Sequence, residues 1–454
     1  MNDLLLIGGR VIDPANSHDG VADVLISGGK VCAMGPDAEK KACEGVERVD
    51  CAGKVVCPGL VDIHVHFREP GQTAKETIES GARSAAKGGF TTVVCQPNTS
   101  PPIDNPGTVA LIQGKAEKSA VVNVYTTGTI TKERKGEELA PIGSLQKAGV
   151  VAITDDGDCI QSNELMRRAA EYASMFNLAI FDHCQDYDVV TDGVMNEGYW
   201  SANLGLKGWP AVGEEIIVAR NILLAELTGA RIHCQHMSSA GSVRLIREAK
   251  SRGVSISGEA CPHHFTLTDA SIAGSEAFWG VDGKELYPGV SAEDLPAWPV
   301  YDTNFKMNPP LRSAEDRQAV IEGIVDGTLE IIGSDHAPHC DYEKEVEFDY
   351  APFGITGLET QLALSLMRFC HTGLMPLSDL IHRLTVAPAK LVNLDKGSLS
   401  IGADGDVTVF DPDEEWSFRR EDTVSKSTNC PFYDWPLKGR AVLTVVAGKI
   451  VSRE

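Results

Sequence analysis

The stretch VDIHVHFREP, from Val61 to Pro70, is the first of eight short apolar runs that decide the fold. Apolar and polar residues alternate along it, as they do along a β-strand. Seven runs of similar length follow: TTVVCQPN, VVNVYTTGTI, GVVAITDDG, LAIFDHCQD, RIHCQHMS, VSISGEACPHH and LEIIGSDHAPH. Helix-like segments lie between the runs, such as AKETIESGARSAAKG, SNELMRRAAEYASMF and EEIIVARNILLAELTG. Eight strands alternating with helices predict an α/β protein with a (β/α)8 TIM barrel.

Both ends of the chain are rich in strand-like sequence and lack the strand–helix alternation of the middle. The first fifty-odd residues contain strand-like runs broken by Gly pairs, and strand-like sequence returns after about Lys396. We therefore expect a small β-sandwich formed by both chain termini. The predicted boundaries are 1–56 and 395–454 for the two parts of the sandwich and 57–394 for the barrel.

Composition limits the function. The 454 residues are 43 % hydrophobic and carry a net charge of −23, so no basic surface for nucleic acid is expected. An anionic substrate would need local cations to attract it. The N-terminus lacks a signal-peptide pattern, no run is long enough to span a membrane, and the twelve cysteines form no C-x-x-C pair. We expect a cytoplasmic protein without membrane or nucleic-acid partners.

Polar residues gather where the predicted strands end. His64, His66 and Arg68 occupy alternate positions and so project from one strand face. Nine of the twelve histidines lie at strand ends, the rim where barrel enzymes carry their active sites. The other clusters are Asp155-Asp156, His183, His233 with His236, His263-His264, and Asp335-His336 with His339. Imidazoles and carboxylates on one rim predict a divalent-metal site, and imidazole suits zinc.

Simpler interpretations exist for single members of these clusters. The Asp155–Gly157 stretch alone could be a turn, and Asp335 alone could cap a helix. Three cysteines beside candidate ligands could be soft ligands or small core residues: Cys184, Cys234 and Cys340. Three histidines outside the pattern are interpreted as structural: His18, His371 and His382.

The assembled motifs resemble the dihydroorotases of the amidohydrolase superfamily, specifically the bacterial type whose two zinc ions share an aspartate. The matching stretches cover nearly the whole predicted barrel: PGLVDIHVHFREPG, GGFTTVVCQPNT, ITDDG, DHCQD, HCQHMS, CPHHFTL, KMNPPLR, SDHAPH and APFGITGLET. HVHFREPG and KMNPPLRS are specific to dihydroorotases and close relatives, whereas H-x-H alone would indicate only the superfamily.

The resemblance implies a role for each matching residue. His64 and His66 would bind one zinc, His183 and His236 the other, and Asp156 would bridge them. Asp335 would contact the first zinc and act as general base and then acid toward a metal-bridging hydroxide. The substrate contacts implied are Arg68, Asn98 and His339 at a carboxylate, and Asn308, Phe353 and Gly354 at a pyrimidine ring.

The activity implied is the reversible cyclisation of N-carbamoyl-L-aspartate to L-dihydroorotate in pyrimidine synthesis. The resemblance also implies a homodimer, and it leaves open an association with aspartate transcarbamoylase. One alternative is another cyclic-amide hydrolase, such as a hydantoinase or allantoinase. Many of these relatives bridge their metals with a carboxylated lysine, but the nearest lysine, Lys147, falls in a predicted helix end. Another alternative is a silent scaffold subunit for the transcarbamoylase, but such chains lose metal ligands.

Two departures from the family pattern stand out. An aromatic-rich segment, residues 273–305, separates the PHH and KMNPP motifs. We interpret this aromatic segment either as a lid or subunit contact or as a surface loop. Gln185 stands where many relatives carry an acid, and we expect it to have little effect on metal binding.

Overall fold

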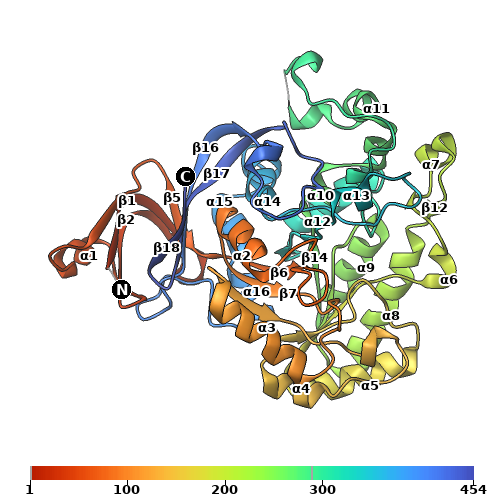
Figure 1. Cartoon of the computed structure of the whole chain (residues 1–454), viewed down its shortest axis with the longest axis horizontal. Coiled ribbons are helices and arrows are strands. Elements are labelled where there is room, and N and C mark those ends of the chain that lie inside the picture. The colour runs from red at the N-terminus through yellow and green to blue at the C-terminus, as the bar shows by residue number, and fades with distance from the viewer. Residues whose placement is uncertain (1–2, 288–289) are drawn as a thin grey trace.

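Both chain ends build one mixed sheet of eight strands, seen with the N and C labels in Figure 1. The computed structural model describes residues 3–287 and 290–454. The strands run in the order β18-β17-β16-β5-β1-β2-β3, and β4 pairs with β1. Their bounds are β1 (Leu4–Asp13), β2 (His18–Ser27), β3 (Lys30–Met34), β4 (Glu47–Asp50), β5 (Val55–Pro58), β16 (Val407–Ser417), β17 (Pro436–Val446) and β18 (Lys449–Arg453). The expectation that the two termini meet in one β module is confirmed.

Parallel strands form the centre of the molecule. One sheet has the order β6-β7-β8 and another the order β15-β14-β13-β10-β9. Isolated parallel bridges connect their edges, Gly128 with Ile153 at one side and Val65 with His336 at the other. The bounds are β6 (Leu60–Val65), β7 (Phe90–Cys95), β8 (Asn123–Thr126), β9 (Ala152–Ile153), β10 (Ala179–Asp182), β13 (Ile232–Cys234), β14 (Ile256–Ala260) and β15 (Ile331–Ile332). A separate short pair joins β11 (Met195–Asn196) to β12 (Gly208–Trp209).

Helices follow the parallel strands in sequence and surround them in Figure 1, so the predicted α/β alternation is confirmed. They are α1 (Pro36–Lys41), α2 (Ile78–Lys87), α3 (Pro106–Ser119), α4 (Ile142–Ala148), α5 (Asn163–Ser174), α6 (Tyr187–Val190), α7 (Tyr199–Leu204), α8 (Val212–Thr228), α9 (Ala240–Ser251), α10 (Pro262–Thr266), α11 (Ser275–Val281), α12 (Ala314–Val325), α13 (Asp341–Lys344), α14 (Gln361–Ser365), α15 (Leu377–Leu384) and α16 (Val386–Leu391). In the described residues, no helix is both long and apolar enough to cross a membrane.

Two local expectations need correction. The helix predicted over 74–88 begins at Ile78, because Thr77 is extended and its side chain accepts a hydrogen bond from the Ser80 amide, capping the helix. The run VSISGEACPHH does not stay extended to its end. Pro262 starts the short helix α10, since its fixed φ suits the first helical position, and His263 and His264 therefore lie on that helix.

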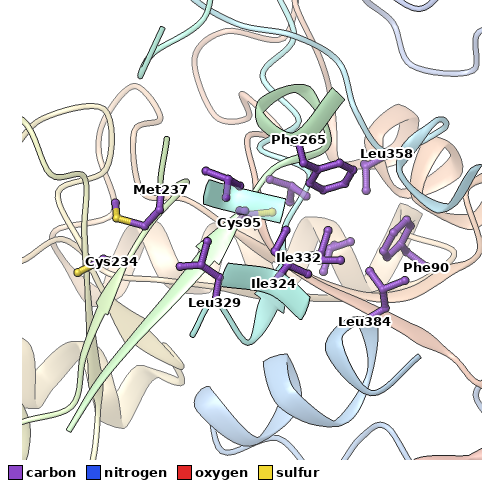
Figure 2. Packing of buried hydrophobic residues seen from close by; sticks show 14 of the residues in the cluster. Phe90, Cys95, Cys234, Met237, Phe265, Ile324, Leu329, Ile332, Leu358 and Leu384 are labelled. Carbon is purple, nitrogen blue, oxygen red and sulfur yellow. The ribbon is translucent and has the colours of Figure 1, made fainter. Parts of the chain in front are cut away.

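Apolar side chains fill the space between the strands and the helices. One large buried cluster includes the ten residues labelled in Figure 2, contributed by strands, helices and loops far apart in the sequence. A smaller cluster lies on other faces of the parallel strands and includes Val61, Ile63, Phe181 and Ile331. Burial on both faces explains why these strands read as nearly continuous apolar runs. The packed strands hold their C-terminal ends in fixed positions, and the polar clusters follow those ends.

The aromatic segment is folded against the C-terminal part of the chain. It contains α11 and short 3-10 turns, and α11 lies at the top of Figure 1. Trp279 and Trp298 lie 5.0 and 5.9 Å, centroid to centroid, from the buried ring of Trp435. Their indole N–H groups donate to the carbonyls of Pro296 and Ser271. Aromatic packing with satisfied polar edges anchors these two indole rings in the fold.

Candidate metal centre and substrate cavity

The six predicted metal ligands come together at the C-terminal ends of the parallel strands. His64 lies in β6, and the other five lie just beyond strand ends: His66 after β6, Asp156 after β9, His183 after β10, His236 after β13 and Asp335 after β15. All six side chains are buried. Parallel strands place their C-terminal ends at one edge, so residues up to 271 positions apart in sequence meet there.

The Asp156 carboxylate lies at the centre of four imidazoles. Its Oδ1 lies 3.5 Å from His64 Nε2 and 3.8 Å from both His183 Nδ1 and His236 Nε2. Its Oδ2 lies 3.4 Å from His66 Nε2. One carboxylate within reach of four imidazoles could be a shared ligand if two cations bound here.

Asp335 completes one side of this arrangement. Its Oδ1 lies 2.9 Å from His66 Nε2 and 3.4 Å from His64 Nε2. Ligand atoms of His64, His66 and Asp335 all lie within 4.8 Å of one another, as do those of His64, Asp156 and His236. The described residues thus contain two overlapping groups that could each hold a metal ion.

The ring nitrogens that face away from Asp156 are mostly held by oxygen atoms. His66 Nδ1 donates to Asn98 Oδ1 at 2.9 Å, and His183 Nε2 donates to Gln185 Oε1 at 3.0 Å. His64 Nδ1 contacts the buried carboxylate of Glu259. At these three histidines such contacts place the proton on the outer nitrogen and direct the inner lone pair toward a metal. His236 differs, because its Nδ1 is buried without a partner among the described residues and its Nε2 lies 2.7 Å from His183 Nδ1. Asp156 Oδ1, in turn, is buried without a hydrogen-bond partner among the described residues. The donor set therefore fits divalent cations.

Electrostatics agree with this fit at Asp156 and His236. At His64, burial lowers the pKa, but the carboxylates of Glu259, Asp335 and Asp156 outweigh burial and raise the pKa well above its usual value. Burial works against a charged Asp156, but the His64, His66 and His183 imidazoles hold the pKa of its carboxyl well below its usual range. Burial, with the neighbouring His183 and His64, lowers the pKa of His236 to about 3. An ionised carboxylate and a neutral imidazole are the forms that bind metals.

Three site residues have backbone conformations that side-chain-bearing residues rarely adopt. Positive φ angles occur at Arg68 (54°), His236 (37°) and Asp335 (45°). Such conformations cost free energy and persist where the surrounding structure enforces them, as it does at active sites. Here the strained residues are two candidate ligands and the cation next to them.

The six predicted substrate contacts line one cavity of about 310 Å³ together with most of the metal ligands. They are Arg68, Asn98, Asn308, His339, Phe353 and Gly354. Burial lowers the pKa of the Arg68 guanidinium only to about 10, so it stays a cation at neutral pH. Gly354 is required by close packing, because a Cβ there would lie 2.7 Å from His339 Cδ2. We call this space the site cavity.

Two buried lysines hold the loop that carries Phe353 and Gly354. Lys344 Nζ donates to the carbonyls of Pro352 and Gly354 at 2.9 and 3.1 Å. Lys306 Nζ donates to the carbonyls of Phe348 and Asp349 and lies 4.7 Å from the centroid of the Phe353 ring. The Nζ atoms of two buried lysines thereby hold the loop at four carbonyls.

Sequence reasoning missed several residues of the site. Glu259 contacts His64 and also His233, whose Nε2 lies 3.2 Å from its carboxylate. A charged residue inside the apolar run of β14 was a signal that could have revealed it. Lys75, whose Nζ lies 3.3 Å from His339 Nδ1, carries no comparable signal in the sequence.

Other side chains near the centre can be compared with the sequence expectations. Gln185 accepts from His183 and also from Asn308 Nδ2 at 3.2 Å, so it links a candidate metal ligand to a candidate substrate contact. Gln185 therefore contacts a candidate ligand directly, and its small effect on metal binding stays a prediction. Cys184 and Cys234 are buried in the large core cluster. Cys261, which the sequence did not single out, groups instead with His263 and His264.

The described part of the aromatic segment lies outside the site cavity. None of its described residues lines that cavity, which favours the surface-loop or contact interpretation over a lid. The segment instead borders a larger cavity of about 810 Å³, shared with β16 and β17 and remote from the histidines at the strand ends. We place the chemistry in the smaller cavity because the buried ligands and cations face it.

Known proteins with similar sequences include dihydroorotases. The family described as Dihydro-orotase-like matches residues 53–242. The dihydroorotase of Citrifermentans bemidjiense is 48% identical over 449 residues, covering 99% of each chain. The dihydroorotase of Pelotomaculum thermopropionicum is 46% identical over 451 residues, again covering 99% of each chain.

Solved structures share the fold at lower identity. The L-hydantoinase (dihydropyrimidinase) of Arthrobacter aurescens has a TM-score of 0.83 at 25% identity, covering 100% of this chain and 96% of the other. The dihydropyrimidinase of Brevibacillus agri has a TM-score of 0.82 at 22% identity, covering 99% and 95%. At this identity the likeness concerns the architecture, whereas the full-length sequence relatives are dihydroorotases.

Proposed function

The chain belongs to the dihydroorotase family, and we propose that a two-zinc centre at its strand ends carries out the reversible cyclisation of N-carbamoyl-L-aspartate to L-dihydroorotate. This is the ring-closing step of pyrimidine synthesis. The observation that carries the proposal is the position of Asp156, whose two carboxylate oxygens are shared among four imidazoles. The hydantoinase-like solved structures support a further inference, that the eight parallel strands close into a (β/α)8 barrel flanked by a β-sandwich.

The residues that would hold zinc divide into two sets that share Asp156. His64, His66 and Asp335 would hold one ion, and His183 with His236 the other. Histidine nitrogen and carboxylate oxygen are ligands that zinc prefers, and a shared carboxylate suits two ions in one site. When bound, zinc supplies Lewis-acid chemistry, polarising an amide carbonyl and making water more acidic.

Asp335 is the proposed proton carrier. In the hydrolytic direction its carboxylate takes a proton from the attacking water while a C–O bond forms at the ring carbonyl. It then delivers that proton to the ring nitrogen as the C–N bond breaks. Its fixed position beside His66, on strained backbone, supports this role.

The cavity residues orient the substrate. Arg68 has the forked geometry that pairs with a carboxylate, and Asn98, which accepts from His66 through Oδ1, keeps its NH₂ group free for the same carboxylate. Asn308 and the backbone at Phe353-Gly354 would bind the ring. A carboxylate-binding end distinguishes dihydroorotate from neutral rings such as hydantoin, which supports the dihydroorotase assignment over a hydantoinase. The presence of all six ligands speaks against a silent scaffold.

Location and assembly are part of the proposal. The family resemblance supports a cytoplasmic enzyme that works on a small-molecule substrate as a homodimer. An association with aspartate transcarbamoylase would be an additional property, and mixing the two purified proteins in a sizing experiment would detect it.

The decisive experiment is a dihydroorotate hydrolysis assay on zinc-replete protein, followed by ultraviolet absorbance, with hydantoin and allantoin as controls. We expect turnover of dihydroorotate alone. Asp335→Asn should lower kcat by roughly 100-fold to 10,000-fold, because the proton carrier is lost. Metal content is measured in both proteins, so that loss of metal is separated from loss of the base.

Each result that would contradict the proposal leads to a different conclusion. Turnover of hydantoin or allantoin in place of dihydroorotate would assign a different cyclic-amide hydrolase. An inactive protein that binds no metal would instead indicate the scaffold subunit. Full activity in Asp335→Asn would remove Asp335 from the mechanism.

A further inference from the structure

Lys75 lies beside the site cavity and has no role in the proposed reaction. It lies in the turn before α2, and its side chain is 18% exposed. Its Nζ lies 2.9 Å from Glu343 Oε1 and 3.3 Å from His339 Nδ1. The ion pair with Glu343 holds the ammonium group next to the imidazole.

His339 is a buried imidazole with a cation at each ring nitrogen. Its Nδ1 faces Lys75 at 3.3 Å, within hydrogen-bond distance, whereas Glu343 Oε2 lies 3.7 Å from Nδ1, beyond that distance. Its Nε2 lies 3.4 Å from Arg68 Nη2 on the cavity side. Its backbone N–H donates to Asn429 Oδ1, which fixes the position of the residue. Burial, then the charges of Arg68 and Lys75, lower the pKa of His339, so its ring is neutral.

A neutral imidazole accepts at one nitrogen and donates at the other. Both neighbouring cations are donors, so only one of them can have its hydrogen bond accepted. Arg68 has another partner, because its Nε donates to the Pro338 carbonyl. Its guanidinium also lines the cavity in which the substrate carboxylate is proposed to bind. Lys75 has the ring and Glu343. The arrangement therefore favours acceptance at Nδ1.

We propose that Lys75 is a positioning residue that fixes the tautomer of His339, holding Nδ1 as an acceptor so that the Nε2–H donates into the cavity to the substrate carboxylate. The inference rests on the proposed function, because the acceptor is the carboxylate of dihydroorotate or N-carbamoyl-L-aspartate. The opposite tautomer would turn a bare lone pair toward that carboxylate and repel it. Glu343, Lys75 and His339 thus form a chain that ends at the substrate.

The kinetic test compares Lys75→Met with Lys75→Arg and with the matched control Lys54→Met. Lys54 pairs with Asp411 in the terminal sheet, away from the cavity. Loss of a hydrogen bond to a charged group should raise KM for dihydroorotate roughly 10-fold to 100-fold in Lys75→Met, with kcat changed less than about threefold. Lys75→Arg should restore most of the loss, and Lys54→Met should match the parent. An unchanged KM in Lys75→Met overturns the inference.

The second readout does not depend on turnover. Holoenzyme labelled with ¹⁵N-histidine reports which ring nitrogen is protonated, and a His339→Asn sample identifies the His339 signals by their absence. We expect protonated Nε2 in the parent and in Lys75→Arg, and a gain of protonated Nδ1 in Lys75→Met. Protonated Nδ1 in the parent, or an unchanged tautomer in Lys75→Met, overturns the inference. If the parent failed to turn over dihydroorotate, the proposed function would fail while this spectrum still decided the tautomer.

Discussion

Residues that are not themselves candidate metal ligands fix the tautomer and orientation of the ligands they contact. Glu259 is fully buried, and its carboxylate contacts His64 and His233. Burial opposes its ionisation, but the His64 charge and hydrogen bonds from His233 and His64 lower its pKa to about 2. An ionised carboxylate under a candidate ligand fixes both the tautomer and the angle of the ring.

Glu259→Gln should therefore weaken metal binding. An amide can still occupy the space, but it cannot accept from both imidazoles as a carboxylate does. We expect metal affinity to fall roughly 10-fold to 100-fold, measured as retention of zinc against a competing chelator. The exposed Glu226→Gln serves as the control. Equal zinc retention in Glu259→Gln and the parent would show that His64 does not depend on this contact.

At the scale of elements, the loop after Phe348 is held by lysine side chains buried beneath it. Lys344 is buried and donates to the carbonyls of Pro352 and Gly354. Burial, followed by repulsion from Lys306, lowers the pKa of Lys344 to about 7. An unfolded chain has a lysine pKa of about 10.4, so between these values the unfolded state binds more protons.

The parent should accordingly gain stability relative to Lys344→Met as pH rises. The contribution of Lys344 is fully present above about pH 10.4 and is lost as pH falls toward about 7. We expect the difference in unfolding free energy to change by about 2–4 kcal/mol across this window, measured by denaturant titration at several pH values. The exposed Lys449→Met should show no such dependence. A pH-independent difference for Lys344→Met would mean that Lys344 titrates like a solvated lysine.

At the scale of the whole molecule, the aromatic segment connects the helical side of the protein to the terminal sheet. Trp435 is 1% exposed and lies among Trp279, Trp298 and Tyr287. The hydroxyl of Tyr287 also donates to the carbonyl of Pro436, where β17 begins. These contacts give the segment a structural role in joining two parts of the chain.

Trp435→Ala should lower the unfolding free energy by about 3–5 kcal/mol, because it removes a large buried ring and leaves a cavity. The KM for dihydroorotate should stay within about twofold of the parent, since the described aromatic segment does not line the site cavity. Denaturant unfolding and steady-state kinetics measure the two effects. A large change in KM without loss of stability would restore the lid interpretation.

The sequence by itself determined the α/β alternation, the joining of both chain ends in one sheet, and the identity of the residues that meet at the strand ends. These features depend on local periodicity and on the rule that parallel strands present their C-terminal ends together. His64 and His66 were visible because a strand has a period of two. Only the tertiary structure decided four other contacts. They are Lys75 beside His339, Glu259 beside His64, Gln185 between His183 and Asn308, and the two lysines that hold the loop carrying Phe353 and Gly354. Each of these contacts joins side chains from different elements, and no local pattern encodes which distant side chains will pack together.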